Sequence, residues 1–584
     1  MSYLKGFKSN YTKYPTTSIE GFDSEAFSGY QAVVKELTGK LEGEKQILVV
    51  DCTVGVNNKE IIDAFADWSD VVIDTIDIYY DYNKMNEMLY RHVTDDRVFA
   101  IAYHGKWLDF VDKDKLVKAK KQVEDASGKV LIVGVGATYI ASGDVLVFAD
   151  MTIWEIQMRY RDGLDNFNAR NFDDETTKKF KRGYFIDWRL SNFHKDGLMK
   201  NMDYYLDTVI PNNPKMITRA AFDEGLLQLL NQPFSLVPFF DEGLWGGQWM
   251  KEVLDLEDKT RSNYAWGYNL LFPENSVSLN FNGMLISIPG YTVCRKYPKE
   301  LIGEKGYARF GCEYPIRYDF LDTMEGGNLS LQVHPTNQYY QENFALPFTQ
   351  DESYYFLDCA EEDTYMYLGI TDQANREDME RDLLRANKGE IVFPAEKYSN
   401  KIPVKKHEHY HIPAGTVHCS GANTMVLEIS SSPCIFTFKL WDWGRVGLDG
   451  KPRPIHIERG VEVIKWDKQE KWMRDTCAFK PVPIAEGEGW KEEKTGLHDL
   501  EFIETRRVWQ TVKTSHLTCG ETHALHLVEG REALIESPSK QFEPFVIHYA
   551  ESVVIPALIS EYTITPYGES ANDEIGIIKG FVRY

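Results

Sequence analysis

The sequence has no run of about 18 apolar residues, the length that a helix needs to cross a bilayer. Its first ten residues are polar and lack the apolar core of a signal peptide. We therefore predict a cytoplasmic protein with no membrane partner.

Paired cysteines and excess positive charge are also missing. The eight cysteines are scattered and no C-x-x-C spacing occurs, which is typical of reduced intracellular thiols. Lys and Arg total 65 against 89 Asp and Glu, so the formal net charge is −24. This charge repels phosphate backbones, and we expect no nucleic-acid partner. A small anionic substrate can still bind in a locally basic pocket.

The first part of the chain alternates strand-like and helical segments. The chain has 584 residues, which is too long for a single hydrophobic core. The alternation over residues 1–215 predicts an α/β domain with a mostly parallel sheet. The predicted strands are residues 47–51, 71–77, 98–102, 130–133 and 145–150, and the predicted helices are residues 60–68 and 108–126.

The first predicted strand leads into a loop that resembles the phosphate-binding loop of nucleoside and phosphoribulo-kinases. With Lys59 aligned on the loop lysine, Asn58 stands where the second glycine belongs and Glu60 where a magnesium-binding hydroxyl belongs. A carboxylate there repels phosphates near the helix N-terminus. We expect a degenerate P-loop-kinase-like domain that binds ATP weakly or not at all.

From about residue 240 onward, short apolar runs, Gly and Pro turns and frequent aromatic residues predict an all-β structure. Several prolines between residues 211 and 238 mark a change of domain. We predict domains at residues 1–215, 233–465 and 466–584, with one helix inserted within residues 373–387.

Four residues have the side chains of a mononuclear metal site. Gln332 and His334 are two apart in an apolar run, so alternation along a strand points both to one face. Glu352 opens a second strand-like run, and His418 follows a Pro–Gly turn that leads into a third. Each residue alone is ordinary. Together, one amide oxygen, two imidazoles and one carboxylate suit a transition-metal ion inside a small β-barrel.

The motifs around these residues resemble the type I mannose-6-phosphate isomerases, which are cupin-fold metalloenzymes. The matching stretches, within residues 233–584, are LWGG at 244–247, FLDT at 320–323, LSLQVHP at 329–335, IPAGTVH at 412–418, VLEI at 426–429 and WDWGR at 441–445. The resemblance implies a double cupin of two jelly-roll barrels. Residues 523–530 and 549–557 resemble the second barrel, which lacks a full ligand set.

The resemblance also implies a site and an activity. Gln332, His334, Glu352 and His418 would hold one divalent ion, with Zn²⁺ the leading candidate among Zn, Fe, Mn, Co and Ni. The implied enzyme is a metal-dependent aldose–ketose isomerase. It would interconvert mannose 6-phosphate and fructose 6-phosphate, a small-molecule sugar phosphate, through a cis-enediol(ate).

The chain departs from the family at two positions. The family often has Lys two residues before the metal-binding Glu, where this chain has Gln350. The family's Arg some twenty residues after the last ligand His is Lys439 here, which keeps the charge and loses the bidentate fork. We expect Lys439 to lie on a hairpin beside the His418 strand. We expect Lys439, together with Arg445, to receive the anionic end of the substrate; Arg453 is a further cation nearby in the sequence.

The general base stays open at this point, because spacing does not distinguish Glu408, His409, Glu428 and Lys439. Other functions also stay open: an isomerase for another hexose or hexose phosphate, or a non-catalytic sugar-sensing or assembly protein. The intact four-ligand set argues against the non-catalytic protein, and Asn58 and Glu60 argue against a bifunctional kinase–isomerase. The sequence does not indicate the oligomeric state.

Overall fold

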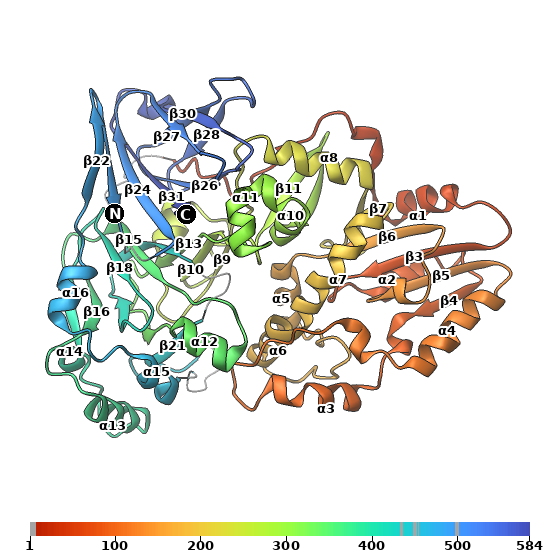
Figure 1. Ribbon diagram of the computed structural model, residues 1–584, viewed down its shortest axis with the longest axis horizontal. Coiled ribbons are helices and arrows are strands. Elements are labelled where there is room, and N and C mark those ends of the chain that lie inside the picture. Colours follow the sequence, from red (N-terminus) through yellow and green to blue (C-terminus); the bar gives the residue numbers. More distant parts are fainter. Residues whose placement is uncertain (1–7, 432–435, 448–452, 454, 497–500) are drawn as a thin grey trace. The chain divides into compact units, whose positions relative to one another are not determined.

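The computed structural model describes residues 8–431, 436–447, 453, 455–496 and 501–584 (Figure 1). The chain divides into two compact units. The α/β unit comprises Thr16–Leu229 and Ser276–Lys296, and the β unit comprises the described residues outside these ranges. The structure as a whole has several sheets and is largely β. No helix among the described residues is long and apolar enough to cross a membrane.

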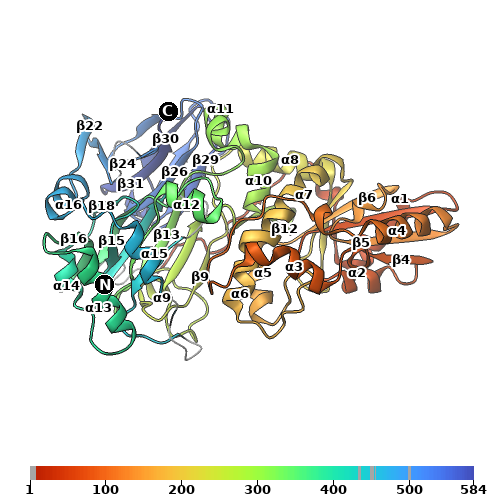
Figure 2. The same cartoon turned by 60° about the horizontal axis from the view of Figure 1, so that its bottom comes forward.

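The α/β unit is built on a seven-stranded sheet with a parallel centre, at the right of Figures 1 and 2. Five strands pair in parallel. In sheet order they are β4 (Val71–Asp74), β5 (Lys129–Gly134), β3 (Gln46–Cys52), β6 (Val145–Asp150) and β7 (Tyr204–Asp207). Antiparallel β8 (Lys215–Thr218) and β2 (Ala26–Ser28) complete the sheet. The prediction of a mostly parallel sheet is confirmed.

The central strands are apolar because helices cover them, as parallel sheets require. The α-helices in the first segment of the unit are α1 (Gly29–Lys40), α2 (Asn58–Ala64), α3 (Tyr82–Val93), α4 (Lys113–Asp125), α5 (Ile153–Arg161), α6 (Thr176–Arg182), α7 (Trp188–Asn201) and α8 (Arg219–Leu230). A turn of π-helix, Gly183–Asp187, joins α6 to α7.

The strand predicted at residues 98–102 is wrong. The Asp96 carboxylate accepts hydrogen bonds from the backbone N–H groups of Val98 and Phe99, at 2.9 and 3.0 Å. This local turn takes the donors that a β-ladder would need. The strand predicted at 71–77 ends earlier for the same reason, since Asp74 caps a short 3₁₀ helix, Thr75–Ile78.

The α/β unit also contains a hairpin from the region predicted as all-β. Strands β11 (Ser276–Phe281) and β12 (Met284–Pro289) pair with each other, and β1 (Thr17–Ser18) pairs in parallel with β11. Helix α10 (Gly290–Lys296) follows the hairpin. Inside this unit, Lys195 Nζ donates to Asp150 Oδ2 at 2.9 Å and lies 3.0 Å from Thr292 Oγ1.

Two antiparallel sheets of the β unit carry the predicted ligands. One contains, in order, β18 (His409–Ile412), β15 (Glu352–Cys359), β20 (Thr424–Ser430), β13 (Arg317–Asp322), β10 (Trp266–Leu270) and β9 (Phe239–Asp241). The other contains β17 (Ser399–Pro403), β16 (Tyr365–Ile370), β19 (His418–Ser420), β14 (Leu331–Val333) and β21 (Phe438–Trp441). Glu352 therefore comes from one sheet, and Gln332 and His418 come from the other.

The predicted hairpin between the His418 and Lys439 strands is wrong. Strand β20 lies between them in sequence and belongs to the other sheet. In space β14 lies between β19 and β21, so Gln332 is opposite His418 on one side and opposite Lys439 on the other. Lys439 is thus a neighbour of Gln332.

The last part of the β unit forms two further sheets around their own apolar core. One contains β22 (Val482–Gly487), β23 (Trp490–Thr495), β24 (Ile503–Gln510), β31 (Ile575–Val582), β26 (His523–Glu529) and β29 (Ser552–Ile555). The other contains β25 (Thr514–Leu517), β30 (Glu561–Pro566), β27 (Glu532–Glu536) and β28 (Phe545–His548).

The β unit also contains helices, which alternate with its strands along the sequence. They are α9 (Trp249–Val253), α11 (Pro298–Phe310), α12 (Asn337–Phe344), α13 (Arg376–Asn387), α14 (Ala395–Tyr398), α15 (Ile457–Val463) and α16 (Glu470–Thr476). Helix α13 lies within residues 373–387, where the charged run predicted an inserted helix.

Candidate metal centre and adjoining cavity

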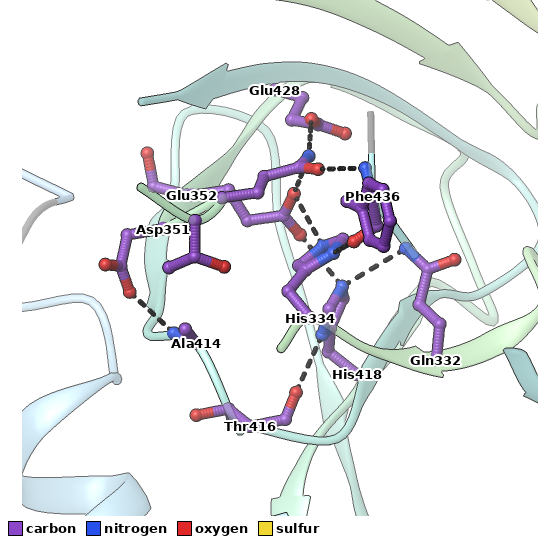
Figure 3. A network of polar contacts seen from close by, with 12 residues as sticks. Gln332, His334, Asp351, Glu352, Ala414, Thr416, His418, Glu428 and Phe436 are labelled. Atoms are coloured by element: carbon purple, nitrogen blue, oxygen red, sulfur yellow. Dashed lines mark hydrogen bonds and ion pairs between the residues drawn. The ribbon is translucent and has the colours of Figure 1, made fainter. Parts of the chain in front are cut away.

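Three of the four predicted ligands converge at one buried point (Figure 3). One donor atom from each of His334, Glu352 and His418 lies within 4.8 Å of the others. His334 Nε2 is 3.0 Å from Glu352 Oε2, and His418 Nε2 is 2.8 Å from Glu352 Oε1. These residues could hold a metal ion.

The outer nitrogen of each imidazole is fixed by a backbone carbonyl. His334 Nδ1 is 2.8 Å from the Phe436 carbonyl oxygen, and His418 Nδ1 is 2.9 Å from that of Thr416. A carbonyl can only accept, so each Nδ1 carries a proton and each neutral ring has its lone pair on Nε2. Both lone pairs then face the Glu352 carboxylate. A shared cation would relieve this repulsion, and carbonyl-anchored imidazoles are typical of metal ligands.

Two buried atoms of the centre have no hydrogen-bond partner among the described residues, namely His334 Nε2 and Glu352 Oε1. Burial alone would raise the pKa of Glu352, but positive charge on the imidazoles of His334 and His418 would hold that pKa well below its usual value, and a divalent cation between neutral imidazoles would act in the same direction. The carboxyl group is therefore an anion, as a metal ligand must be.

Gln332 reaches the same centre from β14. Its side-chain amide nitrogen is 3.2 Å from His418 Nε2. The two ends of a side-chain amide have nearly the same shape, so a half turn about the last bond presents Oε1 instead. The set of two imidazole nitrogens, one carboxylate and one amide oxygen fits a divalent transition-metal ion.

Gln350, where the family often has Lys, links the centre to a second carboxyl group. Its Nε2 donates to Glu352 Oε2 at 2.8 Å and to Glu428 Oε1 at 2.9 Å. Its Oε1 accepts from the Phe436 backbone N–H at 3.2 Å, which fixes the orientation of the amide. Sequence reasoning treated Gln350 only as a lost charge and missed this role.

A cavity of about 170 Å³ adjoins the centre. Charged and polar groups line it: Arg317, Asp319, Ser330, Gln332, Gln350, Glu428, Thr437, Lys439 and Arg453. Apolar walls come from Trp245, Trp266, Tyr268, Leu321 and Leu329. Arg317 and Asp319 also escaped sequence reasoning. The available signal was their alternation with apolar residues along a single strand.

The structure separates the two predicted catalytic residues. Lys439 lines the cavity, and Arg445 is not among the residues that line it. The Arg445 guanidinium donates to Asp442 Oδ1 at 2.8 Å and to the Asn328 carbonyl at 2.7 Å. Arg453 lines the cavity instead, and its Nη1 donates to Asp442 Oδ2 at 2.7 Å.

The pKa of Lys439 is lowered to about 7. Burial is the main cause, and the positive charges of Arg453 and Arg445 add to it against the opposing effect of Asp442. At neutral pH the amine is therefore present in both protonation states.

Of the other predicted bases, only Glu428 lines the cavity. Burial, followed by repulsion from Glu352, raises the pKa of Glu428 well above its usual value, while Arg317 opposes the shift. Glu408 accepts a hydrogen bond from the Lys405 backbone N–H at 2.8 Å. His409 is buried between Thr495 Oγ1 and Ser353 Oγ, both at 2.9 Å.

In the α/β unit, the chain's own groups occupy the loop that resembles a phosphate-binding loop. The Lys59 side chain is 77% exposed and pairs with Asp63 at 2.6 Å. Glu60 Oε2 accepts from the Asn212 backbone N–H at 2.9 Å. The Gly55 carbonyl accepts from Arg159 Nη1 at 3.1 Å.

Comparison with known proteins gives two separate similarities. Residues 29–231 match the family described as Domain of unknown function (DUF8485). The chain is 26% identical over 241 residues to the mannose-6-phosphate isomerase ManA of Bacillus subtilis (strain 168), covering 41% of this chain and 69% of the relative. It is 26% identical over 235 residues to the mannose-6-phosphate isomerase of Streptococcus mutans, covering 40% and 68%.

Among solved structures, the mannose 6-phosphate isomerase from Bacillus subtilis aligns with a TM-score of 0.47 at 17% identity, covering 60% of this chain and 99% of that chain. The curated relatives support an enzyme similar to the mannose-6-phosphate isomerases. The kinase-like character of the α/β unit stays a prediction, since the family matched there is one of unknown function.

Proposed function

We propose that the protein is a metal-dependent aldose–ketose isomerase that interconverts mannose 6-phosphate and fructose 6-phosphate through a cis-enediol(ate). The observation that carries the proposal is the pair of carbonyl-anchored imidazoles, His334 and His418, whose free nitrogens face the Glu352 carboxylate. We also infer that each pair of antiparallel sheets in the β unit is one cupin barrel, which the sheet orders support.

The proposed ligands are Gln332, His334, Glu352 and His418. Two neutral imidazoles, one neutral amide and one carboxylate would leave a net charge of about +1 on a site that holds a divalent ion. A bound ion of this kind supplies Lewis-acid stabilisation of the negative charge that develops on the substrate oxygens. The cavity beside Gln332 gives the sugar room to reach the centre.

Two groups that line the cavity suit the proton transfers. Lys439 lies opposite Gln332 in the sheet, and its pKa of about 7 lets its amine both accept and return a proton near neutrality. Glu428, whose raised pKa favours its protonated form, can donate to a substrate oxygen. We propose that Lys439 moves the proton between C1 and C2. We propose that Glu428 donates a proton to the substrate oxygens.

The anionic end of the substrate needs a cation that stays charged. Arg453 lines the cavity and is held by Asp442, so we propose that Arg453 attracts the phosphate. In this arrangement Arg445 positions Asp442 from the other side, through a 2.8 Å hydrogen bond. The cytoplasm is the compartment that we propose, which the free thiols of buried Cys52, Cys419 and Cys477 support.

A coupled assay on a panel of hexoses and hexose phosphates tests the proposal. We expect wild-type protein to convert mannose 6-phosphate, and Glu352→Gln to lose at least about 100-fold in kcat/KM, because the substitution removes the only anionic ligand. Preference for another hexose phosphate would change the proposed substrate but not the proposed reaction. Absence of turnover on the whole panel by metal-replete protein would reject the isomerase.

A further inference from the structure

The cavity contains a charged pair that neither moves a proton nor contacts the phosphate in the proposed function. Arg317 and Asp319 are two apart on β13, so both side chains face the cavity, and Leu321 continues the same row. Their exposed fractions are 4% and 1%. The Arg317 Nε group pairs with Asp319 Oδ2, and Arg317 Nη2 donates to Glu428 Oε1 at 3.0 Å.

Each member of this pair keeps one polar atom unused. Arg317 Nη1 and Asp319 Oδ1 have no hydrogen-bond partner among the described residues, although both atoms are buried. A buried polar atom without a partner costs free energy, so a ligand that satisfies it binds more tightly. One atom is a donor and the other is an acceptor.

The combination selects the kind of ligand group. A phosphate oxygen would accept from Arg317 but would be repelled by the Asp319 carboxylate. A hydroxyl group both donates and accepts, so neighbouring hydroxyls can satisfy the guanidinium and the carboxylate together. Trp266 and Tyr268, opposite Leu321 and Asp319 on β10, add the apolar wall that small-molecule sites usually have.

We propose that Arg317 and Asp319 form a subsite that binds sugar hydroxyl groups beyond C2, separate from the metal centre and from the phosphate contact at Arg453. The inference rests on the proposed isomerase function and adds a determinant of its sugar specificity. Arg317 connects to Glu352 through Glu428 and Gln350, three hydrogen bonds in all, so the subsite lies within reach of a hexose held at the centre.

A double variant, Arg317→Met with Asp319→Leu, tests the subsite. Replacing both charges together avoids leaving one of them buried and unpaired. The matched control is Arg507→Met with Glu493→Leu, a pair of the β unit whose side chains are 6% and 13% exposed. The two residues are joined by a 2.9 Å hydrogen bond and are absent from the residues that line the cavity. Asp319→Asn, which keeps the shape, serves as a second and milder variant.

The readout is kcat/KM on mannose 6-phosphate and on its 3-deoxy and 4-deoxy analogues. We expect the loss in the double variant to be at least tenfold larger on the parent sugar than on the analogue that lacks the recognised hydroxyl, because the lost Arg317 hydrogen bond to Glu428 affects both sugars alike. We expect Asp319→Asn to show the same pattern with a smaller loss. Metal content and the inhibition constant of inorganic phosphate should stay within twofold of wild type, as should every value of the control.

An equal loss of kcat/KM on the parent sugar and on both analogues would overturn the subsite. An unchanged kcat/KM on the parent sugar, or a loss of inhibition by phosphate, would also overturn it. The last result would identify an anion site instead. Should the wild-type protein turn over none of these sugars, the proposed function fails separately. The same comparison of variant and analogue, made with dissociation constants from calorimetry, then decides the subsite by the same thresholds, and absence of sugar binding would overturn it.

Discussion

The side-chain amide of Gln350 donates a 2.8 Å hydrogen bond to Oε2 of Glu352. The same amide nitrogen holds Glu428 at 2.9 Å, so one neutral residue orients both carboxyl groups. Supporting groups of this kind set the direction of a ligand's lone pairs. We expect Gln350→Met to weaken metal affinity by roughly 10- to 100-fold, measured by competition with a chromogenic chelator. Gln338→Met, on the exposed face of α12, is the control. Unchanged affinity in Gln350→Met would show that Glu352 needs no such support.

Lys439 should set the pH dependence of the reaction. With a pKa of about 7, its amine loses its proton as the pH rises through neutrality, so kcat/KM should rise over the same range. We expect Lys439→Gln to remove this rise and to lower kcat/KM by roughly 10- to 150-fold on mannose 6-phosphate. If Lys439 moves the proton between C1 and C2, we expect a similar loss of kcat/KM on an unphosphorylated sugar. A loss confined to phosphorylated sugars would assign it to the phosphate instead.

The α/β unit should bind ATP weakly or not at all. Lys59 pairs with Asp63 at the surface, and Glu60 places a carboxylate in the first turn of α2. Calorimetry with magnesium and ATP on the full chain should give no saturable heat at millimolar nucleotide. Tight magnesium-dependent binding, or sugar kinase activity, would contradict this expectation.

His194 should make the α/β unit less stable at high pH. Its Nε2 lies 3.0 Å from both oxygens of Asp51. Burial lowers the pKa of His194, but the attraction to Asp51 outweighs it and raises that pKa above 6.5. A raised pKa in the folded state gives stability that is present below pH 6.5 and is lost as the pH rises through the folded value.

We therefore expect His194→Gln to lower the free energy of unfolding by roughly 1.5–3 kcal/mol at pH 5.5 and by less at pH 8.5. Urea unfolding at the two pH values measures the difference. His92→Gln is the control, because His92 Nδ1 contacts a backbone carbonyl rather than a carboxylate. An equal loss in the free energy of unfolding at both pH values would show that the ion pair of His194 with Asp51 does not contribute.

The sequence predicted those parts of the fold that local pattern determines. The apolar runs of β3, β5 and β6 and the motifs around His334 and His418 are such patterns. Residues 98–102 show the limit within a short segment, because the side chain of Asp96 overrode an apolar run. The hairpin β11–β12 shows the limit over long distances. It joins the α/β unit through pairing with residues 17 and 18, and no local sequence pattern predicts this pairing.

The same division applies to the candidate site. The convergence of His334 and His418 could be anticipated because the alternation of residues 332 and 334 and the turn before His418 are local signals, while the ligand set itself stays a prediction. The arrangement of the cavity could not be anticipated. Asp319 lies opposite Glu428 only because β13 pairs with β20, and Lys439 lies opposite Gln332 only because β14 lies between β19 and β21. Such pairings depend on the whole sheet.

Titration of metal-free protein with a divalent cation, followed by conversion of mannose 6-phosphate, tests the central claim most directly. We predict no activity after chelation, a rise that reaches its plateau at about one bound ion per chain, and no rise in His418→Ala. His526→Gln, a buried histidine outside the candidate centre, should titrate like wild type. Full activity in the chelated protein, or normal titration of His418→Ala, would contradict the account.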